Sequence, residues 1–332
     1  MTILRLFTLL SCAGPLAAQT FLQMSDPQIG MYSKDHDFEH ETANFEFAIA
    51  TANRLKPAFV VVTGDLVNQP GNAAQIAEYH RIAAKLDPAI KLYSVAGNHD
   101  VGNEPTRESL ALYRERFGPD YYTFRLGGMA GFVLDSNLEK GTDAVPDEAA
   151  KMEAWFKAEL EKAKREGVRH LIVFQHIPFF LKDPNEPDDY FVVPPATRQR
   201  YLKLLHQYGV TQVFAGHYHR NAEGHDGDLE MITTGPIGMP LEGAKSGLRM
   251  VRVEGDAVTH KYYDFGDLPD RSGVAQPFHA AISAFEPRCL TGAGRQESRH
   301  GKPRGLLYPT RALTKIHDFS TADSRTRRAK TS

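Results

Sequence analysis

Residue types that bind metal ions recur in five short motifs of this 332-residue chain. Carboxylate, amide and imidazole side chains are ligands that divalent metals accept in proteins. Each motif is weak alone, because Gly-Asp and Gly-Asn are also common in turns and helix caps. Turn chemistry would not select aspartate, asparagine and histidine together, so we expect these side chains to converge on one site. The motifs are Asp26-Pro27-Gln28, Gly64-Asp65-Leu66-Val67-Asn68, Gly97-Asn98-His99-Asp100, Gln175-His176-Ile177-Pro178 and Gly216-His217-Tyr218-His219.

The elements that must position these motifs are predicted to alternate between strand and helix. Short β-branched and aromatic runs predict strands, and longer periodic segments predict helices, which together indicate an α/β fold. The motifs follow predicted strands, where α/β proteins place ligands. The strands are predicted at 21–24, 58–63, 91–95, 122–126, 131–134, 169–174 and 212–215. The helices are predicted at 41–55, 73–86, 106–117, 147–166 and 196–208.

After about residue 209 the pattern favours strands alone, at 230–233, 248–254 and 257–263, with a hairpin turn at Glu254-Gly255-Asp256. The sheet is therefore expected to be mixed. A doubly wound α/β domain is the second candidate, and the late strands argue against it. Beyond Asp270 the periodicity stops, so 271–332 is predicted to be a disordered extension.

Composition and charge limit the classes of protein that fit. The apolar fraction of 42% and the charged fraction of 24% are those of a globular protein. The extension carries 12 Lys/Arg against 4 Asp/Glu, which leaves 27 against 37 for the preceding 270 residues. An acidic body gives no support to nucleic-acid binding. The two cysteines, Cys12 and Cys289, flank the body, which excludes a disulfide framework or a cysteine zinc site within it.

The amino terminus has the features of a secretory signal peptide. Arg5 precedes the apolar run from Leu6 to Leu10, and small residues end the segment at Ala17 and Ala18. A first strand or helix of the fold is one alternative, and a lipid anchor on Cys12 is another. We predict a leader at 1–19, a catalytic domain at 20–270 and an exported protein, with no membrane span after the leader is removed.

The ordered set of motifs resembles the signature of the calcineurin-like metallophosphoesterase superfamily. Within that superfamily, Asp26-Pro27-Gln28 and the segments 97–105 and 216–221 look most like the calcineurin-like phosphoesterase domain-containing proteins, sometimes described as protein serine/threonine phosphatases. The resemblance covers about 21–265. It implies a four-layer α/β sandwich, with two mixed β-sheets face to face, helices outside and metals at one rim.

The resemblance also implies two metal ions, manganese, iron or zinc, and a division of their ligands. Asp65 would bridge the two ions, and a bridging hydroxide would attack the phosphoryl group. The first ion would take Asp26, Gln28, Asp65 and His219, and the second would take Asp65, Asn98, His176 and His217.

His99 and Asp100 take their expected roles from the same resemblance. His99 would be the general acid or electrostatic partner at the leaving oxygen, and Asp100 a carboxylate that orients its ring. A turn or helix cap is the alternative for Asp100.

Gln28 departs from the superfamily pattern, which has histidine there in most members. A neutral amide oxygen is a weaker donor than imidazole, so the first site is expected to bind metal less tightly or to prefer a harder ion. The alternative is that Gln28 does not coordinate, and that the other ligands leave a position open for water.

The expected activity is hydrolysis of a phosphoester, with a small phosphomonoester as substrate. Arg220 and Asn221 follow the last motif and are the candidate substrate contacts. A phosphodiesterase, including one that cleaves cyclic nucleotides, is the alternative within the hydrolases. A noncatalytic metal-binding interaction module is the alternative outside them, and the presence of His99 argues against it.

Overall fold

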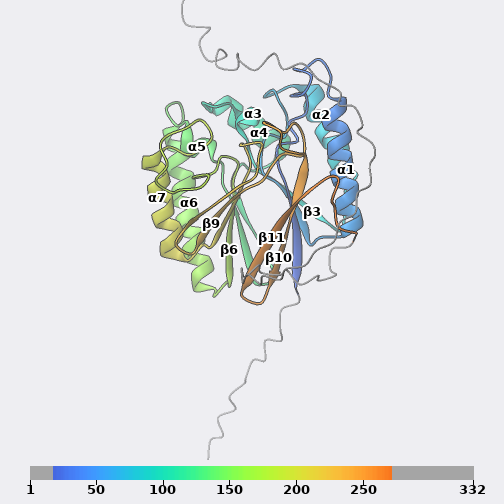
Figure 1. Ribbon diagram of the computed structural model, residues 1–332. Helices are drawn as coiled ribbons and strands as arrows, with labels where there is room; N and C mark the ends of the chain where they lie inside the picture. The colour runs from blue at the N-terminus through green and yellow to red at the C-terminus, as the bar shows by residue number, and fades with distance from the viewer. Residues whose placement is uncertain (1–17, 271–332) are drawn as a thin grey trace, which may run out of the picture. The chain divides into compact units, whose positions relative to one another are not determined.

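The computed structural model describes residues 18–270, which form two β-sheets and the helices that cover them (Figure 1). The predicted extension at 271–332 and residues 1–17 of the predicted leader lie outside the described residues. The strands are β1 (Gln19–Met24), β2 (Phe59–Val62), β3 (Lys91–Ser94), β4 (Tyr122–Leu126), β5 (Met129–Val133), β6 (His170–Phe174), β7 (Gln212–Ala215), β8 (Ala222–Asp226), β9 (Leu229–Thr233), β10 (Gly247–Glu254) and β11 (Ala257–Asp264). The helices are α1 (Glu39–Leu55), α2 (Ala73–Ala83), α3 (Asn98–Val101), α4 (Arg107–Phe117), α5 (Asn137–Lys140), α6 (Pro146–Arg165) and α7 (Pro195–Tyr208).

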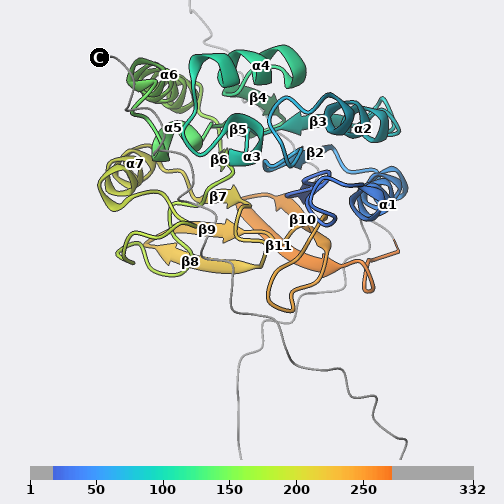
Figure 2. The ribbon, with the colours of Figure 1, turned by 90° about the horizontal axis from the view of Figure 1, so that it is seen from above.

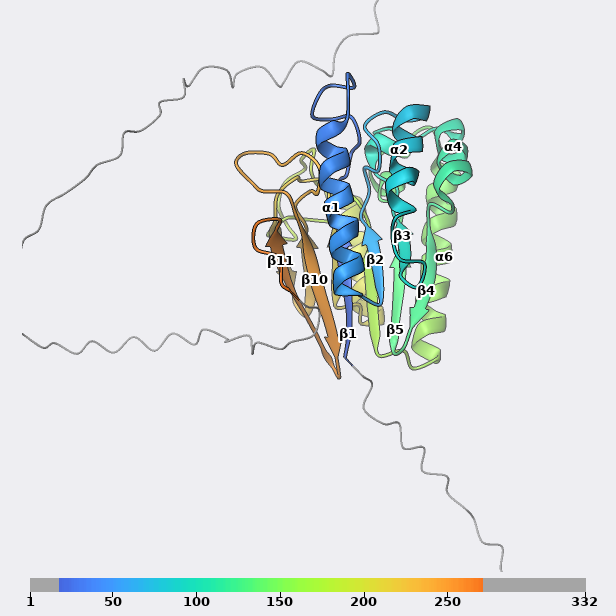
Figure 3. The same ribbon diagram turned by 90° about the vertical axis from the view of Figure 1, so that its right-hand side faces the viewer.

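The two sheets lie face to face with helices on their outer faces. The strand order is β11-β10-β1-β2-β3 in the five-stranded sheet and β4-β5-β6-β7-β9-β8 in the six-stranded sheet. Figure 2 shows α1 and α2 beside the first sheet and α6 and α7 beside the second. Figure 3 shows α1 and α2 on the outer side of β2 and β3. The predicted four-layer α/β sandwich is thus confirmed, and the doubly wound alternative, which needs a single sheet, is wrong.

Strands buried on both faces explain the apolar runs in the sequence. Side chains alternate along a strand, so Phe21 of β1 packs between the sheets while Leu22 packs toward the helices. The ring of Phe174 lies 5.7 Å from Phe21, 5.8 Å from Phe124 and 5.7 Å from Phe214. Burying each such side chain stabilises the fold by about 1.5–3 kcal/mol. This aromatic layer holds the two sheets together.

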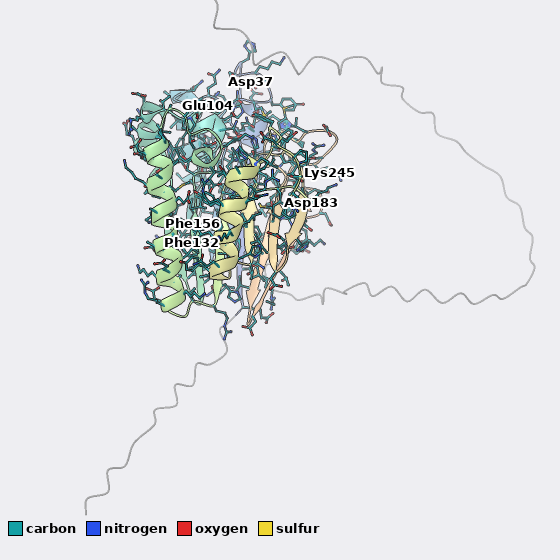
Figure 4. All side chains as sticks on the ribbon, turned by 90° about the vertical axis from the view of Figure 1, so that its left-hand side faces the viewer. Asp37, Glu104, Phe132, Phe156, Asp183 and Lys245 are labelled. Carbon is teal, nitrogen blue, oxygen red and sulfur yellow. The ribbon has the colours of Figure 1, made fainter. Side chains whose placement is uncertain are left out.

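Apolar stripes on the helices form the outer layers of the core. Phe156 of α6 lies against Phe132 of β5, with ring centroids 5.6 Å apart (Figure 4). α6 begins with Pro146 at its first turn, where the missing N–H costs nothing, and its last turn carries Lys162, Lys164 and Arg165. α6 begins and ends one residue before the predicted bounds of 147–166. None of the helices among residues 18–270 is long and apolar enough to cross a membrane.

Most inner strands run parallel, which brings their carboxyl ends to one rim. In the first sheet β1, β2 and β3 are parallel neighbours, and in the second β5, β6, β7 and β9 are. The chain returns to the first sheet through β10, which pairs antiparallel with β1. The predicted mixed character of the sheets is confirmed. β1 begins at Gln19, one residue before the predicted start of the domain.

The structure contains elements that the sequence analysis did not predict. The edge strand β8 reads Ala-Glu-Gly-His-Asp and pairs with β9, and its polar alternation with a glycine gives little strand signal. The single-turn helices α3 and α5 are too short to show a period. The predicted hairpin turn is present, with Gly255 in the left-handed region at φ 59°.

Candidate metal centre

Six of the predicted ligands lie together at the rim formed by the carboxyl ends of the strands. Three follow strands of the five-stranded sheet and three follow strands of the six-stranded sheet. All are between 0% and 4% exposed, so water has little access to them. The first three are Asp26 after β1, Asp65 after β2 and Asn98 after β3, and the others are His176 after β6 with His217 and His219 after β7.

Two groups within this set have the spacing of metal ligands. Asp65, His176 and His217 form one group, and Asp26, Asp65 and His219 form the other. Within each group the ligand atoms lie within 4.8 Å of one another. Asp65 belongs to both groups, which is the arrangement that the resemblance implies for a bridging carboxylate.

Five of the seven candidate ligands adopt a backbone conformation that is uncommon for residues with side chains. Asp26, Gln28, Asp65, His217 and His219 have φ between 41° and 68°. Left-handed residues other than glycine cost about 1–3 kcal/mol each and cluster at functional sites, where the surrounding fold must hold them. The strain is therefore concentrated in the loops that present the ligands.

Glycines in the motifs allow the loops to approach each other. A Cβ on Gly97 would lie 2.1 Å from the backbone nitrogen of Asp65, and one on Gly64 would lie 2.3 Å from Nδ1 of His176. A Cβ on Gly216 would lie 2.0 Å from Oγ of Ser25. Real Cβ contacts are not this short, so a larger residue would move the ligands.

Backbone carbonyl groups fix the three histidine rings. Nδ1 of His176 contacts the carbonyl oxygen of Thr63 at 2.8 Å, and Nδ1 of His219 contacts that of Met239 at 2.6 Å. Nε2 of His217 contacts the carbonyl oxygen of Tyr190 at 3.1 Å. A carbonyl accepts the ring N–H, which selects the tautomer and leaves the other nitrogen for a metal.

The remaining atoms fit a cation. Because Nδ1–H of His176 donates to Thr63, Nε2 of the neutral ring carries a lone pair. That atom lies 3.0 Å from Oδ1 of Asn98 and 3.3 Å from Oδ1 of Asp65, so three acceptors face one another. Burial lowers the pKa of His176, but the charges of Asp65 and Asp26 outweigh it and raise the pKa to about 9. A proton bound at Nε2 of His176 therefore occupies the position that suits a metal ion.

The charge states of neighbouring groups are those that bind metal. Burial opposes ionisation of Asp65, but the facing His176 and His99 rings outweigh it and hold the pKa of this carboxyl well below its usual range. Burial, with the nearby His176, lowers the pKa of His217 well below its usual value. An ionised carboxylate and a neutral imidazole are the forms that metals need.

Gln28 lies in the same cluster of loops with one atom unpaired. Its side chain is 0% exposed, and Nε2 donates to Oδ1 of Asn68 at 3.3 Å. Oε1 is buried and has no hydrogen-bond partner within 18–270. A buried amide oxygen without a partner costs stability unless a ligand satisfies it, so the Gln28 side chain fits a metal ligand.

His99 lies at the edge of the cluster and is only half-buried. Its backbone N–H donates to Oδ1 of Asp65 at 2.9 Å. Its Nδ1 atom contacts the carbonyl oxygen of Asn68 at 2.8 Å, which directs Nε2 away from that carbonyl. The carbonyl oxygen of Asn68, the last residue of the second motif, therefore holds the His99 ring in place.

Asp100 does not orient the His99 ring, contrary to the role implied by the resemblance. Its carboxylate accepts hydrogen bonds from the backbone N–H groups of Gly97, Leu66 and Val67, at 2.8–3.1 Å. Burial and the charge of Asp65 raise the pKa of Asp100 to about 8, against the effect of these N–H groups. Asp100 caps the start of α3 and joins the second and third motifs, while the Asn68 carbonyl contacts the His99 ring.

The two predicted substrate contacts, Arg220 and Asn221, have protein partners. The Arg220 guanidinium pairs with Glu242 and lies 4.0 Å from the centroid of the Tyr218 ring. Oδ1 of Asn221 accepts from the backbone of Gly235 and from the buried Arg249. Each side chain therefore already has a structural role beside the last motif.

Two residues at the site were not singled out by the sequence. Tyr190 lies in the segment between β6 and α7, and its hydroxyl accepts from Nδ2 of Asn98 at 3.3 Å. Ser25, next to Asp26, donates its hydroxyl to that carboxylate. No motif surrounds Tyr190. Ser25 directly precedes the first motif, so its position could have indicated it.

Comparisons with known proteins agree with this geometry. The model of the family described as Calcineurin-like phosphoesterase matches residues 19–221. A bovine protein (Bos taurus) named serine/threonine-protein phosphatase CPPED1 is 35% identical over 266 residues, which are 76% of this chain and 85% of that protein.

Solved structures share the fold at low sequence identity. A dimetal phosphatase from Danio rerio has a TM-score of 0.55 at 16% identity and covers 76% of this chain and 100% of its own. A purple acid phosphatase from yellow lupin (Lupinus luteus) has a TM-score of 0.58 at 12% identity, with 76% and 52% covered. The extent of the family match and the bovine relative together show that the chain belongs to the calcineurin-like phosphoesterase family.

Proposed function

We propose that this chain is a phosphatase that hydrolyses phosphoric monoesters with the aid of two metal ions. One observation carries the proposal: Asp65 is shared by two groups of buried ligand atoms, each of which also contains histidine. Family membership supports a metal-dependent phosphoester hydrolase. The donor set of carboxylates, imidazoles and amides suits manganese, iron or zinc.

The protein groups would hold the ions and keep bulk water away from them. Asp26, Asp65 and His219 would hold one ion, with Gln28 as a further ligand, and Asp65, His176 and His217 would hold the other, with Asn98. Bound there, two ions would polarise the phosphoryl group and lower the pKa of a water molecule toward 7. The burial of these side chains keeps bulk water away from the reacting group.

His99 would serve the leaving group. The Asn68 carbonyl accepts the proton on Nδ1, so in the protonated ring the proton available for transfer is the one on Nε2. His99 is half-buried, and we propose that this edge of the ring faces the substrate oxygen. A histidine in this position can give a proton to the departing alkoxide, which contributes roughly 10²–10⁴ to the rate.

A phosphomonoester is the substrate class that we favour, and a phosphorylated serine or threonine side chain is one member of it. The name of the bovine relative, a serine/threonine-protein phosphatase, supports a phosphorylated serine or threonine as the substrate. The body of the chain is acidic, which disfavours long polyanions as substrates.

We propose further that the enzyme is exported, because residues 1–19 have the features of a signal peptide. A secreted product whose intact mass begins at Met1 would count against a cleaved leader.

The test is a parallel assay of the full chain on p-nitrophenyl phosphate and bis(p-nitrophenyl) phosphate, after reconstitution with Mn²⁺, Fe²⁺ or Zn²⁺. We expect turnover of the monoester to exceed that of the diester, and Asp65→Ala to abolish both. His99→Asn should lower kcat by about 10²–10⁴ and leave the metal content unchanged. Faster turnover of the diester would favour a phosphodiesterase.

Two results would reject the hydrolase itself. One is the absence of turnover with all three metals although two ions are bound, which would favour a noncatalytic metal-binding module. The other is full activity in Asp65→Ala. An exposed aspartate supplies the matched control, because Asp256→Ala removes a carboxylate far from the rim.

A further inference from the structure

Tyr190 contacts two of the ligands that the second metal would use. Its phenol oxygen accepts a hydrogen bond from Nδ2 of Asn98 at 3.3 Å. Its backbone carbonyl accepts one from Nε2 of His217 at 3.1 Å, and the two rings lie 5.0 Å apart. Asn98 and His217 come from different sheets, so one residue outside the motifs joins ligands from both sides of the site.

Each contact decides which atom of the ligand faces the metal. The amide of Asn98 can present either its oxygen or its nitrogen, and only the oxygen binds a cation. Because Nδ2 donates to the Tyr190 phenol, Oδ1 is turned toward His176, from which it lies 3.0 Å. Likewise the Tyr190 carbonyl takes the proton on Nε2 of His217 and leaves Nδ1 as the donor atom.

Two cations hold the segment that carries Tyr190. Nζ of Lys140 donates to the carbonyl oxygens of Asp189, Tyr190 and Val192, at 2.9, 2.6 and 2.8 Å. Lys140 ends α5, so the position of Tyr190 depends on that helix. The tyrosine side chain itself is 51% exposed, and its removal should do little to the core.

The second cation is the fully buried guanidinium of Arg198. It donates to the carbonyl oxygens of Val193, Pro184 and Glu186, at 3.2, 3.0 and 2.7 Å. These carbonyls lie in the same segment, before and after Tyr190. The loop is therefore fixed along much of its length, which makes its contacts with the ligands specific.

We propose that Tyr190 is a positioning residue for the metal ion held by Asn98, His176, His217 and Asp65, and that Lys140 sets its place. The inference rests on the proposed dinuclear site. According to this proposal, the loop that carries Tyr190 increases the affinity of the site for this ion and does not affect the other ion. Partners that orient metal ligands typically change metal affinity 10- to 100-fold when they are removed.

The first experiment measures metal binding by the full chain. Wild type, Tyr190→Phe and the control Tyr32→Phe are stripped of metal and titrated with Mn²⁺ by calorimetry, with the bound ions counted after dialysis. We expect Tyr190→Phe to bind one ion as tightly as wild type and the other at least 10-fold more weakly. Tyr32 is 53% exposed, so its variant should match wild type.

The second experiment tests the link through the loop. Lys140→Met should weaken the same ion, and Lys140→Arg should restore part of the affinity because it keeps a cationic donor. Thermal unfolding of the metal-free variants confirms that they are folded before they are compared. Equal weakening of both ions in these variants would overturn the assignment to one site.

The outcomes separate this inference from the proposed function. If wild type binds two ions and turns over substrate, while Tyr190→Phe binds both ions with wild-type affinity, the inference is wrong and the phosphatase stands. If wild type does not bind two ions, both are wrong. A selective loss of one ion in Tyr190→Phe supports the inference whatever the preferred substrate is.

Discussion

Among the candidate ligands, Gln28 is the one whose residue type we expect to tune one half of the proposed centre. It occupies a buried position with left-handed backbone, and its amide oxygen has no protein partner among the residues described. The superfamily pattern that the motifs resemble has histidine at this position in most members. The exchange replaces a strong neutral donor by a weaker one without changing the charge, so it should alter affinity more than reactivity.

We predict that Gln28→His tightens the ion held with Asp26 and His219 by about tenfold, equivalent to about 1.4 kcal/mol. Competition with a chelator of known affinity measures this change. Gln69→His is the control, because Gln69 is exposed and lies in the neighbouring loop. Unchanged affinity in Gln28→His would place Gln28 outside the ligand set.

At the scale of elements, the short helix α5 carries an unpaired acid. Glu139 is 2% exposed, and neither oxygen of its carboxyl has a partner within 18–270. Burial, and then the charges of Asp135 and Glu153, raise the pKa of Glu139 well above its usual value, while Arg200 opposes them. The folded protein therefore holds a proton that the unfolded chain releases.

The sign of the pH dependence follows from this difference. Between the unfolded pKa near 4.5 and the higher folded pKa, the folded state binds more protons, so stability falls as pH rises. We predict that Glu139→Gln gains stability relative to wild type as the pH rises above about 5 toward the folded pKa, by up to about 1.4 kcal/mol per pH unit. Urea unfolding at several pH values measures it. A constant difference, equal to that of the exposed control Glu115→Gln, would contradict the prediction.

Most of the elements, and the loops that bring the candidate ligands together, could be predicted from the sequence for a physical reason. Apolar periodicity is local, and metal-binding loops follow strands directly, so Asp65 and His217 could be found from their neighbours. Tyr190 and the edge strand β8 could not, because the first depends on how a loop folds back on α5 and the second has a polar sequence. The role of Asp100 was wrong because three backbone N–H groups, not a ring, surround its carboxylate.

At the scale of the whole molecule, the last residues that the structure describes contact α1. Nη1 of Arg54 in α1 donates to the carbonyl oxygens of Pro269 and Asp270, at 2.7 and 2.8 Å. The periodicity of the sequence stops at the same place. Strand β11, just before it, pairs with β10 from Ala257 to Asp264 and belongs to the first sheet.

We predict that a chain ending at Asp270 keeps the free energy of unfolding within about 0.5 kcal/mol of the full chain, as for changes away from the core. Urea unfolding and metal content together test this. A chain ending at Glu254 serves as the comparison, since it lacks β11 and should lose stability. A large loss in the longer variant would show that 271–332 contributes to the core.

The antiparallel pairing of β1 with β10 affects how the chain can fold while it is being synthesised. The second sheet is built from one continuous stretch of chain, β4 to β9, and can form as soon as that stretch is made. The first sheet has to wait for its last two strands, and until then one edge of β1 has no neighbour. An open edge of this kind can pair with another chain. Aggregation during synthesis should therefore depend on how soon residues 247–264 follow, and slower translation just before them should lower the yield of soluble protein.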